Sequence, residues 1–203
     1  LIEVNNEATR REFYDVARIL YADDDQWVCP LDVEIEDIFN PEENSLFRDG
    51  GAIRWILHDD SGHPTGRVGA FFNRGKASKN EQPTGGLGFF ECINDQDAAN
   101  MLFDACHDWL KEKGMEAMDG PITFGENITN WGLLIDGFTL PVYGMPYNSP
   151  YYKELFEGYG FSTYFEQFSY EKDLAEPFPE RQVRFSYHLK DKYQVEHFSY
   201  KKK

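Results

Sequence analysis

Apolar side chains recur at helical spacing in two long segments of the chain. The spacing of three and four positions over residues 7–21 and residues 95–113 predicts two amphipathic helices. Gly114 follows the second helix, where a left-handed residue commonly ends one. The two stripes are Phe13, Val16, Ala17 and Leu20, and then Ala98, Met101, Leu102, Ala105, Cys106, Trp109 and Leu110.

Apolar and polar residues alternate instead in the middle of the chain. This pattern predicts consecutive strands over residues 51–58, 66–73 and 85–92, joined by a turn and a polar loop, as in an antiparallel meander. Strict alternation along the third strand would place Leu87 and Phe89 on the same face as Glu91.

Shorter elements are predicted before and after these segments. They are a strand over 1–5, a short helix over 33–39, a strand over 115–122, a helical turn near 130–135, a helix over 150–159 and a final strand over 162–174. The order of strands and helices predicts an α/β (α+β) fold, with a mixed central sheet flanked by helices.

Two prolines interrupt the pattern after the final predicted strand. Pro177 and Pro179 lie in a segment that is typical of a linker, and residues 183–200 then show new strand-like alternation. We therefore predict one domain over residues 1–178, followed over 179–203 by a linker and the start of a second domain. Because the sequence also lacks an initiator Met, we expect it to be part of a longer polypeptide.

The chain is strongly acidic, with a formal net charge of −16. Nucleic-acid binding requires a basic surface and is disfavoured, whereas acidity could steer an amine substrate, although its usual effect is solubility. No apolar run is long enough for a transmembrane segment. The three cysteines and five histidines lack metal-ligand spacing, so we expect no metal and a reduced, cytoplasmic setting.

Four sequence strings carry a resemblance to a known family. They are Gly88-Phe89-Phe90-Glu91, residues 120–127 (GPITFGEN), residues 131–138 (WGLLIDGF) and residues 148–161 (NSPYYKELFEGYGF). With the strand and helix over 85–114, they resemble the GCN5-related N-acetyltransferase (GNAT) superfamily. Within it they are similar to a group of long bacterial GNAT-like proteins that includes bacterial ceramide synthases. The resemblance covers about residues 50–175.

The resemblance implies acyl transfer to a primary amine, with acyl-CoA or acetyl-CoA as co-substrate. It also implies a second GNAT-like domain in a longer chain, and a sphingoid-type or other long-chain amine would suit the aromatic loop over 138–152. The small-molecule partners would thus be an amine and an acyl thioester.

The same resemblance places the co-substrate's pyrophosphate at the start of the helix over 95–113. Backbone N–H groups there favour an anion, and the candidate cofactor-binding residues are Phe89, Phe90, Cys92, Asn94 and Gln96. Ala98 is the one residue of this stretch that matches the family's phosphate-binding loop. We expect Asn94 or Asp95 to cap the helix and Asp97 to lie in its first turn, where carboxylates oppose a phosphate.

Candidate catalytic residues follow from the same comparison. Glu91 lies where related enzymes place a general base for the attacking amine. Phe156 stands where many have a proton-donating Tyr, so Tyr151 and Tyr152 are the candidate acids. Alternatively, Glu91 is simply a surface carboxylate, and the two tyrosines only pack their rings at the start of a helix. The candidate substrate-binding residues are Glu126, Asn127, Trp131 and Asn148.

Three functions stay open at this point. The first is the N-acyltransferase implied by the resemblance. The second is a non-catalytic GNAT-like half that binds the acceptor or docks on a second, catalytic domain, which the altered phosphate loop and Phe156 favour. The third is an interaction module that uses the acidic face.

Overall fold

The computed structural model describes residues 1–79, 81–125, 131–173 and 175–193. The chain divides into two units, Leu1–Ser162 and Thr163–Lys203. The predicted division into a GNAT-like domain over 1–178 and the start of another over 179–203 stays a prediction.

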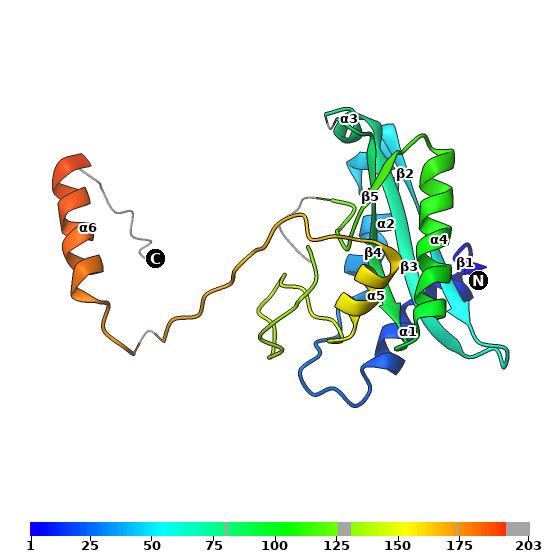
Figure 1. Cartoon of the computed structure of the whole chain (residues 1–203), viewed down its shortest axis with the longest axis horizontal. Helices are drawn as coiled ribbons and strands as arrows, with labels where there is room; N and C mark the ends of the chain where they lie inside the picture. Colours follow the sequence, from blue (N-terminus) through cyan, green and yellow to red (C-terminus); the bar gives the residue numbers. More distant parts are fainter. Residues whose placement is uncertain (80, 126–130, 174, 194–203) are drawn as a thin grey trace, which may run out of the picture. The chain divides into compact units, whose positions relative to one another are not determined.

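One five-stranded sheet organises the described part of the first unit (Figure 1). Its strands, in spatial order, are β1 (Ile2–Glu3), β2 (Gly50–His58), β3 (Pro64–Asn73), β4 (Thr84–Cys92) and β5 (Ala117–Asp119). Neighbours are antiparallel from β1 to β4, whereas β4 and β5 are parallel. The predicted meander and the mixed central sheet of an α/β fold are therefore confirmed.

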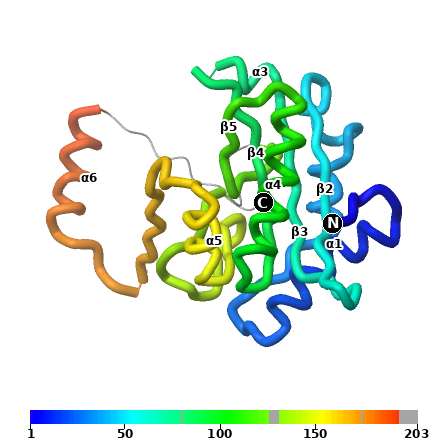
Figure 2. Tube along the Cα trace, turned by 45° about the vertical axis from the view of Figure 1, so that its right-hand side comes forward, coloured from blue at the N-terminus to red at the C-terminus, as the bar shows by residue number. Residues whose placement is uncertain are grey.

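Helices cover both faces of this sheet (Figure 2). The helices of this unit are α1 (Glu7–Leu20), α2 (Asp32–Phe39), α3 (Arg74–Ala77), α4 (Gln96–Glu112), α5 (Tyr152–Tyr159) and the 3₁₀ helix η1 (Ser45–Asp49). Side chains of α4 and α5 pack with one face of β3 and β4 in the larger apolar cluster. Side chains of α1 and α2 form a smaller cluster on the other face, where Phe89 of β4 joins them.

Local sequence signals explain the bounds of α4. The side chain of Asp95 accepts a hydrogen bond from the Ala98 amide at 2.8 Å and so caps the first turn. Gly114 adopts a φ of +82° just beyond the last turn, which glycine tolerates best. Five side chains of the helix are buried: Ala99, Leu102, Phe103, Cys106 and Leu110. The predicted helix, its cap and its end are all confirmed.

β4 contains a bulge that the alternation pattern did not predict. Arg67 of β3 pairs with Glu91 of β4, and Gly69 of β3 pairs with Gly88 of β4. Between these two pairs, one residue of β3 therefore lies opposite two residues of β4. Phe89, one of those two, adopts a φ of +54°. Leu87 consequently packs with α4 and Phe89 with α1 and α2, so the prediction that they share one face is wrong.

Three other predictions beyond β5 also need correction. Residues 162–173 form no regular secondary structure, although a strand was predicted over 162–174, and residues 131–135 are not helical. Helix α6 (Glu180–Tyr193) replaces most of the strand predicted over 183–200. Periodicity alone did not detect α6, because its exposed side chains leave no apolar face buried. Residues 130, 174 and 194–200 lie outside the described residues.

The aromatic centre of the larger cluster gives a test of the core. The ring of Phe103 is fully buried and contacts Phe90, Phe156 and Phe161 at centroid distances of 4.7–5.4 Å. We expect Phe103→Ala to lower the free energy of unfolding by about 3–5 kcal/mol, measured by urea denaturation. Phe168→Ala, which truncates a 68% exposed ring, is the control and should change it by less than about 0.5 kcal/mol. Equal effects would contradict this packing.

Candidate functional site

Glu91 is the centre of a buried polar cluster at the end of β4. One carboxylate oxygen lies 3.5 Å from Nη2 of Arg67, and the other accepts a hydrogen bond from the Tyr152 hydroxyl at 2.7 Å. Arg67 comes from the neighbouring strand β3, and its Nη1 also donates to the carbonyl oxygen of Phe13 in α1 at 2.8 Å. The cluster thus joins two strands and two helices around one carboxylate.

Burial controls the acid–base properties of Glu91 and Arg67. Desolvation raises the pKa of Glu91 above its ordinary value, although the charge of Arg67 and the hydroxyl of Tyr152 oppose that shift. Desolvation likewise lowers the pKa of the Arg67 guanidinium. Nε of Arg67 has no hydrogen-bond partner among the described residues. A raised pKa suits a carboxylate that must take up a proton, but little of Glu91 reaches solvent.

Two tyrosines at the start of α5 contact the same end of β4. The Tyr152 hydroxyl accepts a hydrogen bond from the Cys92 amide at 3.0 Å, and the Tyr151 hydroxyl donates to the Cys92 carbonyl oxygen at 2.7 Å. Pairing of β4 with β5 ends at Gly86, so these hydroxyls serve backbone groups that β5 does not reach. Tyr152 is fully buried, whereas Tyr151 is half-buried. The structure thus brings all three catalytic candidates together at the end of β4, and their catalytic roles stay a prediction.

The start of α4 is occupied by its own acidic side chains. Asp95 holds the Ala98 amide, and Asp97 lies in the first turn. Asn94 is exposed, whereas Nε2 of Gln96 donates to the side chain of Asn100 and to the carbonyl oxygen of Leu155 in α5. Gln96 therefore ties two helices together. The carboxylates make this helix start a poor match for a pyrophosphate.

The other candidate cofactor residues face inward. The rings of Phe89 and Phe90 pack on opposite faces of the sheet, and the Cys92 thiol is buried with a pKa raised to about 12 by desolvation. Phe156 is buried against Phe90 and Phe103. Phe90 and Cys92 are buried and could therefore contact a ligand only through their backbone, whereas Phe89 is partly exposed.

The candidate substrate-binding residues lie in the long loop before α5. Asn148 is buried, and its side chain accepts a hydrogen bond from the Leu134 amide at 2.7 Å and donates to the Leu134 carbonyl oxygen at 3.1 Å. It thereby fixes two distant parts of the loop to each other. Trp131 is half-buried, and Glu126 and Asn127 lie outside the described residues.

Sequence reasoning missed two members of the cluster. Arg67 interrupts an otherwise apolar strand that is buried on both faces, and this conflict with the pattern was the available signal. Tyr21 ends α1, and its buried hydroxyl bonds with Glu91 and Tyr152 and accepts a hydrogen bond from the Ser149 amide at 3.2 Å. Its ring stacks on Trp27 at 5.1 Å. Nothing in the local sequence distinguishes Tyr21 from a residue that simply packs.

The described ranges hold neither a metal-binding cluster of side chains nor a membrane-spanning helix. Within them, no three His, Cys, Asp or Glu side chains gather closely enough to hold a metal ion. No helix in the same ranges combines the length and the apolar character needed to cross a bilayer.

Comparisons with known proteins give three likenesses, although no family model matches the sequence. The chain is 29% identical over 186 residues to the bacterial ceramide synthase of Caulobacter vibrioides, covering 89% of this chain and 47% of that protein. It is 29% identical over 160 residues to the protein YghO of Escherichia coli, covering 77% of this chain and 40% of that protein. A putative acetyl transferase from Pyrococcus furiosus aligns with a TM-score of 0.44 at 13% identity, covering 85% of this chain and 99% of that one.

The similarity to the ceramide synthase confirms the resemblance inferred from the sequence, and with it a GNAT-like relationship. The chain spans less than half the length of both curated relatives.

The buried pair of Arg67 and Glu91 gives a second test. Removal of one partner leaves the other charge buried alone, so we expect Arg67→Met to cost about 3–5 kcal/mol of unfolding free energy. Adding Glu91→Gln should recover part of that loss, which urea denaturation of both variants would measure. The exposed pair of Arg11 and Glu7 is the control, with single losses of about 0.3–0.5 kcal/mol. Strictly additive losses at Arg67 and Glu91 would refute their coupling.

Proposed function

We propose that this chain is a GNAT-like N-acyltransferase domain that transfers an acyl group from acyl-CoA or acetyl-CoA to a primary amine. The observation that carries the proposal is the cluster of Glu91, Tyr151 and Tyr152 at the end of β4, beside the part of that strand that β5 does not pair. The similarity to a bacterial ceramide synthase supports the reaction class. By the same likeness, a sphingoid-type or other long-chain amine is the proposed acceptor.

The cluster supplies groups for both proton transfers of such a reaction. A neutral amine would attack the thioester carbonyl carbon, and backbone N–H groups of residues 87–91 would stabilise the resulting oxyanion. Glu91 would accept the proton lost by the amine nitrogen, directly or through water, and its raised pKa suits this role. As the carbon–sulfur bond breaks, the leaving thiolate would take a proton from a tyrosine.

Tyr151 suits the role of acid better than Tyr152. The Tyr152 hydroxyl is buried and is already occupied by Glu91, Tyr21 and the Cys92 amide. The Tyr151 hydroxyl donates a hydrogen bond to the Cys92 carbonyl oxygen but has none with Glu91, and its side chain is half-buried. Burial raises the pKa of Tyr151, so the hydroxyl keeps its proton at neutral pH. We assign Tyr152 to the positioning of Glu91.

A second candidate function is a non-catalytic half that binds the acceptor or docks on a catalytic domain. Asp95 and Asp97 at the start of α4 favour it, because they oppose the phosphates of a coenzyme. The near-complete burial of Glu91 beside Arg67 favours it as well, since an amine must reach that carboxylate. In this case the remaining half of a longer protein would supply the chemistry.

The assignment of the acid predicts different effects for the two tyrosines. We expect Tyr151→Phe to lower kcat by about 10²–10⁴-fold with the fold intact, because a general acid is lost. Thiol release from acetyl-CoA and from a long-chain acyl-CoA, with a set of primary amines, measures the rate. Tyr170→Phe, which alters a 90% exposed residue outside the aromatic loop over 138–152, is the control and should not change it. An unchanged kcat in a folded, active Tyr151→Phe protein would exclude Tyr151 as the acid.

The two candidate functions differ in their response to Asp97→Asn. If this half binds CoA, removal of the charge should tighten binding by a few fold, since such a surface charge contributes about 0.3–1 kcal/mol. The gain should be greater at low salt, because salt screens exposed charges. Calorimetric titration of CoA into the wild type and the variant measures it, and Asp108→Asn near the other end of α4 is the control. No binding by either protein would favour the non-catalytic half.

A further inference from the structure

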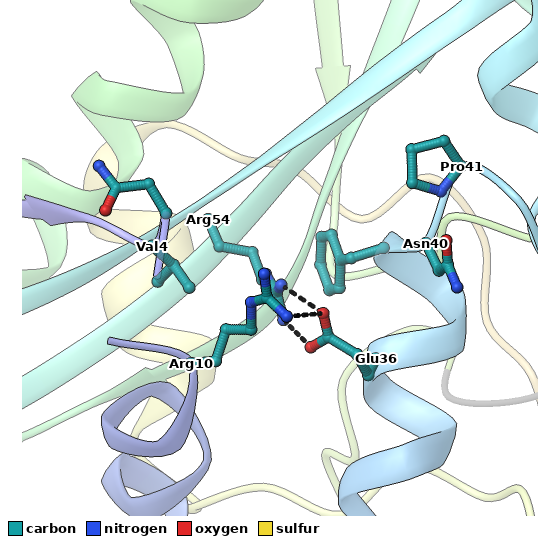
Figure 3. A pocket seen from close by; sticks show the side chains of 8 residues that line it. Val4, Arg10, Glu36, Asn40, Pro41 and Arg54 are labelled. Atoms are coloured by element: carbon teal, nitrogen blue, oxygen red, sulfur yellow. Dashed lines mark hydrogen bonds and ion pairs between the residues drawn. The ribbon is translucent and has the colours of Figure 1, made fainter. Parts of the chain in front are cut away.

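A pocket of about 320 Å³ opens beside α1 and α2, apart from the cluster around Glu91. Its wall combines charged, amide and apolar side chains from β2, both helices and the residues that follow β1 and α2 (Figure 3). The lining residues are Val4, Asn5, Arg10, Glu36, Phe39, Asn40, Pro41 and Arg54.

Two guanidinium groups face a single carboxylate in this pocket. Both terminal nitrogens of Arg54 donate to the Glu36 carboxylate, at 3.0 and 3.2 Å, and the Tyr14 hydroxyl donates to it too. Burial opposes ionisation of Glu36, but its hydrogen bonds with Arg54 and Tyr14 outweigh burial and lower its pKa. Glu36 is therefore ionised at neutral pH and neutralises Arg54, which leaves the charge of Arg10 in excess.

Arg10 has unused hydrogen-bonding capacity. Its Nη1 lies 3.7 Å from the Glu36 carboxylate, beyond hydrogen-bond distance, and its guanidinium donates to no described residue. The Asn40 side-chain oxygen accepts a hydrogen bond from the Glu42 amide, so the Asn40 NH₂ group can donate elsewhere. A guanidinium and an amide thus offer donors in one depression.

The wall behind these donors is held in place. The Arg54 side chain is 8% exposed, and its guanidinium lies over the rings of Phe13 and Phe39, at 5.4 and 4.3 Å from their centroids. These contacts and the two bonds to Glu36 fix its plane. Val4 and Pro41 complete an apolar rim that would accommodate a short carbon chain.

A second surface pocket has charged side chains of the opposite sign in its wall. It lies near η1 and is lined by Asp37 and Glu43, with no basic side chain. The chain as a whole carries a net charge of −16. An excess positive charge inside a depression is therefore a local feature of the first pocket, and it favours an anionic ligand.

We propose that the pocket between α1, α2 and β2 binds a small organic anion, a carboxylate or a phosphate monoester, with Arg10 as its main contact. Asn40 donates a further hydrogen bond, and Val4 and Pro41 contact the apolar part of the ligand. Arg54 and Glu36 form the fixed floor. The proposal is independent of the acyltransferase function, because none of these residues belongs to the Glu91 cluster.

The test titrates acetate and inorganic phosphate separately into the isotope-labelled 203-residue chain, at constant ionic strength against chloride. We expect saturable NMR shifts at Arg10 and Asn40 with at least one of the two anions, which also distinguishes the carboxylate from the phosphate. Arg10→Gln should weaken binding at least about fivefold, because a charge-assisted hydrogen bond is lost. Arg11→Gln, one position along and paired with Glu7 on the exposed surface, should leave it unchanged.

A third variant separates binding from a general effect of charge. Glu36→Gln removes the anion that occupies Arg54, so in the folded variant an added anion should bind several-fold more tightly. Weaker binding to this folded variant would overturn the proposal. Shifts that rise linearly without saturation, or equal affinity in Arg10→Gln and the wild type, would also overturn it.

Discussion

One additional residue in β4 determines what every later side chain of that strand can reach. Where Arg67 and Gly69 pair across to Glu91 and Gly88, three residues on β3 face four on β4, and Phe89 takes up the difference with a positive φ. Beyond this bulge the alternation changes phase. Glu91 therefore forms its ion pair with Arg67 on the side of α1, while the side chain of Cys92 belongs to the larger apolar cluster on the side of α4.

The residue next to the bulge is a glycine because another segment of the chain approaches it closely. A Cβ on Gly88 would collide with the carbonyl oxygen of Ile122, which lies beside β4 just after β5 has ended. Close approach of this segment is possible only without a side chain. The string Gly88-Phe89-Phe90-Glu91 thus has a physical meaning for each member: close approach, a change of phase, a core ring and a buried carboxylate.

Regular periodicity predicted most of the fold, and departures from it account for the errors. The bounds of α1, α4 and the meander followed from apolar spacing, from Asp95 and from Gly114. The three catalytic candidates were named from a family resemblance, and the structure brings them together. Their surroundings could not be predicted, because the partners of Glu91 depend on a one-residue bulge and on Tyr21, which is 70 positions away in the sequence. Residues 162–173 were misassigned because alternation indicates a strand only where a partner strand exists.

The two hydroxyls that contact Cys92 have a consequence for local unfolding. A backbone amide at a sheet edge usually exchanges its proton with solvent when its partner strand separates. The Cys92 amide is bonded instead to a side chain of α5, and its carbonyl oxygen accepts from the adjacent residue of that helix. Its protection against exchange therefore depends on how firmly the start of α5 is held. Opening of this helix would expose the Cys92 amide and carbonyl groups to solvent while the end of β4 stays paired with β3.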